Sequence, residues 1–182
     1  MSQAAHTAPG KARTGAVPAL LKVEALVVRL IGVLLGLGLI AMVAVNVANA
    51  AGRYTGLFAL VGADEALVYG MIWIVMLGAI LAARRRDHLS INLLPAGLSG
   101  RPAMLLQIAL DAVTVAASAF IAVQSYDFIE RIARLNQTSM GLGVPMVIPH
   151  SAILVGFTGI AAVTAVLMVV DIARLGRGEG RA

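Results

Sequence analysis

The chain has 182 residues, of which 60% are hydrophobic and 13% are charged, whereas a soluble domain has about 45–50% apolar and about 25% charged residues. This composition excludes an ordinary soluble protein and leaves room for four membrane-spanning helices, without a separate soluble domain. The net charge of +5 comes with arginines that flank apolar segments, so nucleic-acid binding is not expected, and the absence of cysteine excludes disulfides, thiolate metal sites, iron–sulfur clusters and covalent haem.

Residues 1–22 are rich in Ala, Gly, Thr and Pro and show no helical apolar period, so we expect a disordered cytoplasmic N-terminus. Residues 23–49 form the first predicted spanning helix. Its Gly32 and Gly36 make a G-x-x-x-G pattern, which either admits a closely packed helix or is a chance match. The tripeptide at residues 48–50 resembles a signal-peptidase site, but the apolar segment is much longer than the ~7–15 residues of a signal peptide. We therefore expect an uncleaved helix.

A second spanning helix is predicted over residues 64–86. It opens with Asp64 and Glu65, continues uncharged from residue 66 to residue 83, and closes with Arg84, Arg85 and Arg86. An uncharged run of this length crosses the ~30 Å hydrocarbon core, and the charges at both ends complement the helix dipole. The three arginines are interpreted as topology determinants and lipid-phosphate contacts, with contact to a partner subunit as the alternative. The segment at residues 89–98 is broken by proline and glycine, which favours a short amphipathic segment along the cytoplasmic interface.

The third helix is predicted over residues 102–132 and carries a polar and small stripe on one face. The stripe consists of Gln107, Asp111, Thr114, Ser118 and Ser125. A stripe of this kind in lipid surroundings must face protein. Asp111 is the one carboxylate that could lie inside the bilayer. We expect it to be an interfacial or interhelical hydrogen-bonding residue, with a role in an ion pathway as the alternative.

The fourth helix is predicted over residues 147–170, after an outer loop that ends near Pro145 and Pro149, and residues 176–182 are expected to form a cytoplasmic tail. Three of the fourteen Lys and Arg residues, Arg53, Arg131 and Arg134, lie on the side opposite the other eleven. The positive-inside bias therefore places both termini and the middle loop in the cytoplasm. The sequence predicts an all-α integral membrane protein in which residues 23–175 form four transmembrane helices.

Chemical motifs are sparse. His88 and His150 fall at opposite ends of their helices, so one haem cannot reach both across the hydrocarbon core. The sequence shows no metal-ligand spacing, no nucleophile with a histidine partner on its own side, and no phosphate-binding glycine pattern. It also lacks the repeated halves and interrupted helices of an independent secondary transporter. These features favour a helper subunit and make catalysis unexpected.

The stretch around the second predicted helix carries a sequence pattern that is more specific for one protein family than the rest of the chain. An acidic residue opens a Trp-containing apolar helix, which is followed by Gly-Ala, basic residues and His-Leu-x-Ile. This pattern resembles the DctQ-like small membrane subunit of tripartite ATP-independent periplasmic (TRAP) transporters. The matching residues are Glu65, Trp73, Gly78, Ala79, Arg84 to Arg86, His88, Leu89 and Ile91. A second match is formed by Pro145, Pro149 and the pair Gly156-Phe157, and the resemblance covers about residues 23–175.

The resemblance implies a large multi-pass subunit that moves an organic anion by a sodium-coupled elevator motion, and a periplasmic binding protein that delivers the anion. This chain would brace the large subunit in the bacterial inner membrane, bind no substrate and hold no cofactor, with sodium bound by the large subunit. The alternative is a membrane-anchor subunit of a respiratory or redox complex. The following residues are predicted to contact partners or lipids: Glu65, Trp73, Gly78, Arg84, Arg85, Arg86, His88, Asp111, Thr114, Ser118, Pro145 and Pro149.

For two of these residues, the sequence leaves different roles open. Trp73 lies mid-helix, too deep for an interfacial belt, so it belongs either to the bundle core or to a partner-facing surface. Glu65 is expected to be a helix-start carboxylate, with contact to the delivery protein as the alternative.

Overall fold

A computed structural model describes residues 16–85 and 100–177, with side chains from Glu24 onward. It contains four helices: α1 (Ala16–Thr55), α2 (Ala63–Arg85), α3 (Arg101–Arg134) and α4 (Val147–Gly176). Each is long and apolar enough to cross a membrane. Within the described ranges, β-structure is limited to one isolated bridge between Thr138 and Pro145. The predicted all-α fold with four spanning helices is therefore confirmed.

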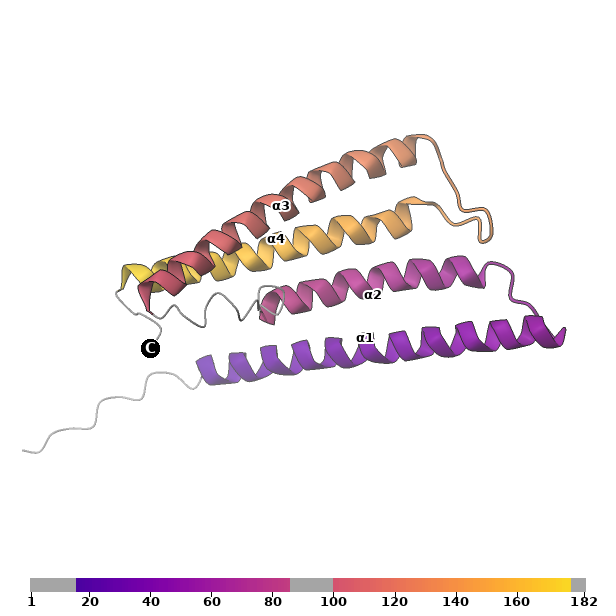
Figure 1. Ribbon diagram of the computed structural model, residues 1–182, viewed down its shortest axis with the longest axis horizontal. Coiled ribbons are helices and arrows are strands. Elements are labelled where there is room, and N and C mark those ends of the chain that lie inside the picture. Colours follow the sequence, from indigo (N-terminus) through magenta and orange to yellow (C-terminus); the bar gives the residue numbers. More distant parts are fainter. Residues whose placement is uncertain (1–15, 86–99, 178–182) are drawn as a thin grey trace, which may run out of the picture.

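The four helices lie side by side in the order α1, α2, α4, α3, so that chain order and spatial order differ (Figure 1). The main helix contacts join α3 to α4, α4 to α2, and α2 to α1. The protein is thus a layer one helix thick rather than a closed bundle. One end of the layer, here called the loop end, carries the α1–α2 and α3–α4 connections. The other, the terminal end, carries the first residues of α1 and the last of α4.

Two helices, α1 and α4, are longer than the apolar segments from which they were predicted. α1 begins at Ala16 and ends at Thr55, so it includes residues 16–22, which were predicted to be disordered. Its first turns contain alanine and leucine, which favour helix in water as well as in lipid. α1 stops before Gly56, whose φ of 71° is the left-handed conformation common just after a helix. α4 continues to Gly176, past the predicted end at residue 170. The predicted interfacial segment at residues 89–98 lies outside the described residues.

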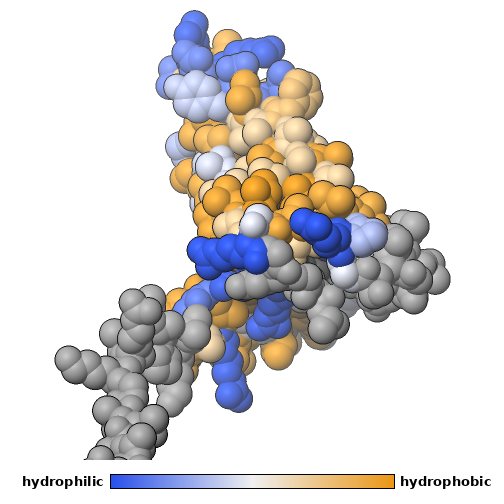
Figure 2. Space-filling model, turned by 90° about the vertical axis from the view of Figure 1, so that its left-hand side faces the viewer, coloured by the Kyte–Doolittle hydropathy of each residue, from blue (hydrophilic) through white to orange (hydrophobic). Residues whose placement is uncertain are grey.

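Seen from the terminal end, hydrophilic side chains gather across the near face and again at the far upper edge, with apolar surface between them (Figure 2). This distribution is typical of a membrane protein whose helix ends reach the headgroup regions. α1 contributes much of the apolar surface, because no residue in its most hydropathic stretch of 18 residues is buried within the chain. An exposed apolar helix face is ordinary in lipid, so it does not by itself mark a partner site.

Buried residues recur at regular intervals along both α3 and α4. The buried residues of α3 are Met104, Asp111, Ser118 and Ile132, which are separated by seven residues or a multiple of seven. Those of α4 are Pro149, Ala152, Gly156, Ile160, Thr164 and Asp171, separated by three, four or seven. The buried line of α3 faces α4, its main neighbour, whereas α4 lies between α3 and α2 and buries residues against both. The polar stripe predicted from the sequence therefore runs along the face that α3 turns to α4.

Glycines set how closely the neighbouring helices approach. A Cβ at Gly156 would lie 2.6 Å from Met76 Sδ, and a Cβ at Gly159 would lie 2.5 Å from Ile80 Cδ1, so α4 touches α2 where it lacks side chains. In the G-x-x-x-G pattern of α1, a Cβ at Gly32 would have ordinary contact with Leu81, whereas one at Gly36 would meet no atom within 4 Å. Half of that pattern therefore faces away from the helix contact.

Candidate interaction site

The carboxylate of Glu65 fixes the loop between α3 and α4. Its Oε1 accepts the backbone N–H of Gly141 and its Oε2 accepts that of Leu142, both at 3.0 Å. The loop is closed on itself, because Ser139 donates its backbone N–H to the carbonyl of Val144 at 2.9 Å, while the Ser139 hydroxyl accepts the N–H of Val144 at 3.2 Å. Glu65 thus joins the start of α2 to the α3–α4 loop. Neither of the two roles predicted for it included this contact.

The α1–α2 connection is held at the same end by Asn49. Its side chain is 1% exposed, and its Oδ1 accepts the N–H of Leu60 at 3.0 Å. An ion pair of 3.2 Å between Arg53 and Asp64 joins the last turn of α1 to the first turn of α2. The tripeptide that resembled a signal-peptidase site lies inside the continuous helix α1. Its asparagine has a structural role that the sequence did not reveal.

The loop end exposes large apolar side chains despite this internal bonding, both in the two connections and in the last turn of α1. More than two thirds of the surface of each of the following is exposed: Tyr54, Leu57, Val61, Leu135 and Met140. Apolar and aromatic side chains at the boundary between hydrocarbon and water are suited to contact with lipid headgroups or another protein. The ordered backbone beneath them gives the loop end a defined shape.

Arg84 and Arg85 lie at the terminal end of α2 and differ in their contacts. Arg84 forms an ion pair with Glu24 of α1, with its Nε 3.0 Å from Glu24 Oε1. It therefore connects two helices of the chain, a role not predicted for it. Arg85 is exposed at the last residue of α2. Arg86 and His88 lie outside the described residues, so their predicted contacts stay predictions.

Asp111 and Ser118 are 1% and 4% exposed, which places both inside the protein rather than on its surface. The amide of Gln107 donates to Asp111 Oδ1 at 2.9 Å. Thr114 is half-buried, and its hydroxyl donates to the carbonyl of Leu110 one turn earlier at 2.9 Å. The stripe does face protein, as predicted. The protein that it faces includes helix α4 of the same chain, so the stripe is not a free surface for a partner.

The remaining candidates are distributed over α2 and the start of α4. Trp73 is half-buried in the middle of α2. Among the described residues, no atom of another element lies within 4 Å of a Cβ placed at Gly78, so this glycine marks no close helix approach there. Pro145 pairs with Thr138 in the isolated bridge, and Pro149 is buried in the first turn of α4, where a missing backbone N–H costs no helical hydrogen bond.

The described candidate residues therefore fall into separate groups at the loop end, along the α3–α4 contact, in the interior of α2 and at the terminal end. Sequence analysis missed Glu24, Asn49, Gly159 and Asp171. The sequence does contain a feature that points to Glu24, because it is a lone carboxylate in an apolar helix. A carboxylate near lipid needs a cationic partner.

The model of the family "Tripartite ATP-independent periplasmic transporters, DctQ component" matches residues 39–175, well over half of the chain. No curated protein matches the chain.

Proposed function

The chain belongs to the DctQ family of components of tripartite ATP-independent periplasmic transporters, and from this premise we propose that it is the bracing subunit of a sodium-coupled importer of an organic anion. Family membership makes it a multi-pass membrane protein of a transporter, associated with a large membrane subunit and a binding protein. That family is a transporter-component family rather than an enzyme family. The bracing role, the sodium coupling and the location in the bacterial inner membrane are the proposal.

The observation that carries the proposal is the family match, which runs from the second half of α1 to the end of α4, and the architecture supports it. Each helix is continuous from end to end, whereas carriers that bind substrate at the bilayer midplane use interrupted helices there. The helices form a layer held by glycine contacts and by bonded connections at the loop end. Such a layer can widen a fixed wall against which a moving domain of the large subunit slides.

Reconstitution tests the function directly. Proteoliposomes are prepared with the large subunit, the binding protein and a labelled C4-dicarboxylate or another candidate anion, with and without this chain. We expect uptake to require an inward sodium gradient, to fall when this chain is omitted, and to be absent with this chain alone. Undiminished uptake without this chain would refute the bracing role. Uptake that persists when potassium replaces sodium would refute the coupling.

Photocrosslinking tests the association separately. Benzoylphenylalanine is placed at Ile40 of α1 or Phe120 of α3, each 66% exposed and at opposite edges of the layer. The same two variants kept in the dark are the control. A bracing subunit should give a light-dependent crosslink to the large subunit from at least one edge. Absence of crosslinks from both edges would contradict contact through the sides of the layer.

A further inference from the structure

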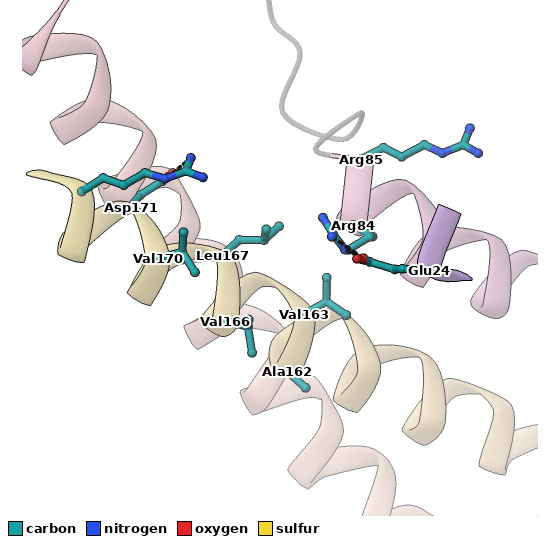
Figure 3. Close-up of a pocket in the computed structure, with 10 residues that line it drawn as sticks. Glu24, Arg84, Arg85, Ala162, Val163, Val166, Leu167, Val170 and Asp171 are labelled. Carbon is teal, nitrogen blue, oxygen red and sulfur yellow. Dashed lines mark hydrogen bonds and ion pairs between the residues drawn. The ribbon is translucent and has the colours of Figure 1, made fainter. Parts of the chain in front are cut away.

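The terminal end contains a cavity of about 650 Å³ between the α1–α2 pair and α4. Glu24 comes from α1, Arg84 and Arg85 come from α2, and the remaining lining residues come from α4 (Figure 3). α1 and α4 are not neighbours in the layer, so the cavity lies over α2 where it ends. A second hollow of about 380 Å³ shares Glu24, Arg84 and Arg85 and extends along α1. The two hollows therefore meet at the Arg84–Glu24 pair.

The lining changes from charged to apolar along α4. The apolar part consists of Ala162, Val163, Val166, Leu167 and Val170. Asp171 and Arg174 follow, and their side chains lie 3.7 Å apart. In the close-up, Val163 and Leu167 lie across from the Arg84–Glu24 pair, while Arg85 extends outward at the rim (Figure 3). The cavity thus has an ionic mouth and an aliphatic floor.

The length of the floor corresponds to one leaflet. At ~1.5 Å per residue, residues 162–170 cover about 12 Å of α4, close to half of the ~30 Å hydrocarbon core. The ionic mouth would then lie at the depth of the headgroups. A small soluble anion would use the mouth but leave the aliphatic floor unfilled, whereas an acyl chain would fill it.

The charges at the mouth favour an anion. Three arginines and two carboxylates line the cavity. Among the described residues, Glu24 and Asp171 each have an arginine partner, and Arg85 pairs with no carboxylate. Basic pockets between transmembrane helices on the cytoplasmic side typically bind anionic headgroups.

We propose that this cavity holds one anionic phospholipid, with its headgroup at the ionic mouth beside Arg85 and an acyl chain along Val163, Val166 and Val170. The lipid would fill the space between α2 and α4 at the terminal end, where helix contact is replaced by the cavity. It would thus act as a structural part of the layer. This inference does not depend on the transported substrate or on sodium coupling.

Native mass spectrometry of the purified full-length chain, alone and with the large subunit, tests the proposal. The probes are phosphatidylglycerol and phosphatidylcholine with identical acyl chains, so that the headgroup is the only difference. We expect one phosphatidylglycerol to remain bound in both preparations at concentrations at which phosphatidylcholine is lost. Inorganic phosphate should not displace it. Displacement by inorganic phosphate would indicate a soluble-anion site and overturn the proposal.

Variants separate the headgroup site from the acyl site. A surface arginine contributes about fivefold to the binding of an anionic lipid, so Arg85→Gln should weaken phosphatidylglycerol binding about fivefold. Arg131→Gln, at the loop end, is the matched control and should change nothing. Val166→Trp fills the floor without changing any charge and should weaken both lipids.

Each variant is first checked for an unchanged unfolding midpoint. If Val166→Trp fails that check, Val166→Phe replaces it. Equal retention of the two lipids, or equal effects of Arg85→Gln and Arg131→Gln, would overturn the proposal. Loss of the lipid whenever the large subunit is bound would assign the cavity to a helix of that subunit instead.

Discussion

Replacing Gly159 by alanine tests whether close contact between α4 and α2 holds the layer together. The new Cβ would lie 2.5 Å from Ile80 Cδ1 and 2.8 Å from Ile80 Cγ1. Ile80 is β-branched, so its Cγ1 cannot move aside without leaving the preferred rotamer about χ1. The helices would have to separate, or Ile80 would have to adopt a strained rotamer.

Two effects of opposite sign determine the change in the free energy of unfolding. Alanine favours a helix over glycine by about 1 kcal/mol, and overpacking costs about 1–3 kcal/mol. Gly159→Ala should therefore range from neutral to about 2 kcal/mol destabilising. Gly78→Ala retains the favourable effect alone, because no atom lies within 4 Å of the new Cβ, and should stabilise by about 1 kcal/mol. The difference between the two variants, about 1–3 kcal/mol, isolates the clash.

The assay is unfolding by increasing fractions of sodium dodecyl sulfate in mild detergent, followed by the fluorescence of Trp73, the single tryptophan. Gly159→Ala should be restored in an Ile80→Ala background, because that change removes all three side-chain atoms that the new Cβ meets. Equal unfolding midpoints for Gly159→Ala and Gly78→Ala would refute the close-contact reasoning. So would an undiminished cost of Gly159→Ala in the Ile80→Ala background.

Three further outcomes are expected. Glu65→Gln leaves one of the two loop amides without its acceptor, so hydrogen exchange in the α3–α4 loop should accelerate while exchange in the middle of the helices stays unchanged; unaltered loop exchange would contradict the clamp. Ser118→Leu should destabilise by about 1–3 kcal/mol through overpacking of the α3–α4 contact, whereas Val113→Leu, at a site 67% exposed, should not; equal midpoints would show that the buried line does not hold these helices. Met140→Cys should react with an impermeant thiol reagent from the periplasmic side and Arg177→Cys should not, and the reverse pattern would invert the predicted topology.

The number and type of helices could be predicted because each span contains a long apolar stretch with few charges, and in α2 this stretch is bounded by charges at both ends. Helix ends were less predictable, since hydropathy marks where the hydrocarbon ends and not where backbone hydrogen bonding stops. α1 and α4 both continue into polar sequence for this reason. The order of the helices could not be predicted, because four apolar helices in lipid have no hydropathic preference for one neighbour over another.

The sequence identified several residues of the candidate site, but it did not predict which contacts they make. Glu65 was recognised, but its bonding to the backbone of Gly141 and Leu142 joins segments far apart in sequence, which spacing does not reveal. Arg84 was recognised as a flanking charge, while its partner Glu24 lies 60 residues away. Gly78 and Gly159 are equally small residues in apolar helices, and only the three-dimensional contacts show which of them touches a neighbour.

The one-helix thickness of the layer has a mechanical consequence. Along the helix axes the layer is stiff, because bending there would strain backbone hydrogen bonds. Across the axes, resistance comes from single lines of side-chain contact, such as those at Gly32 and Gly159, and packed helices can slide past one another by small shear motions. The layer can therefore bend across its width by small movements between neighbouring helices. It can follow a curved neighbouring surface while each helix stays intact.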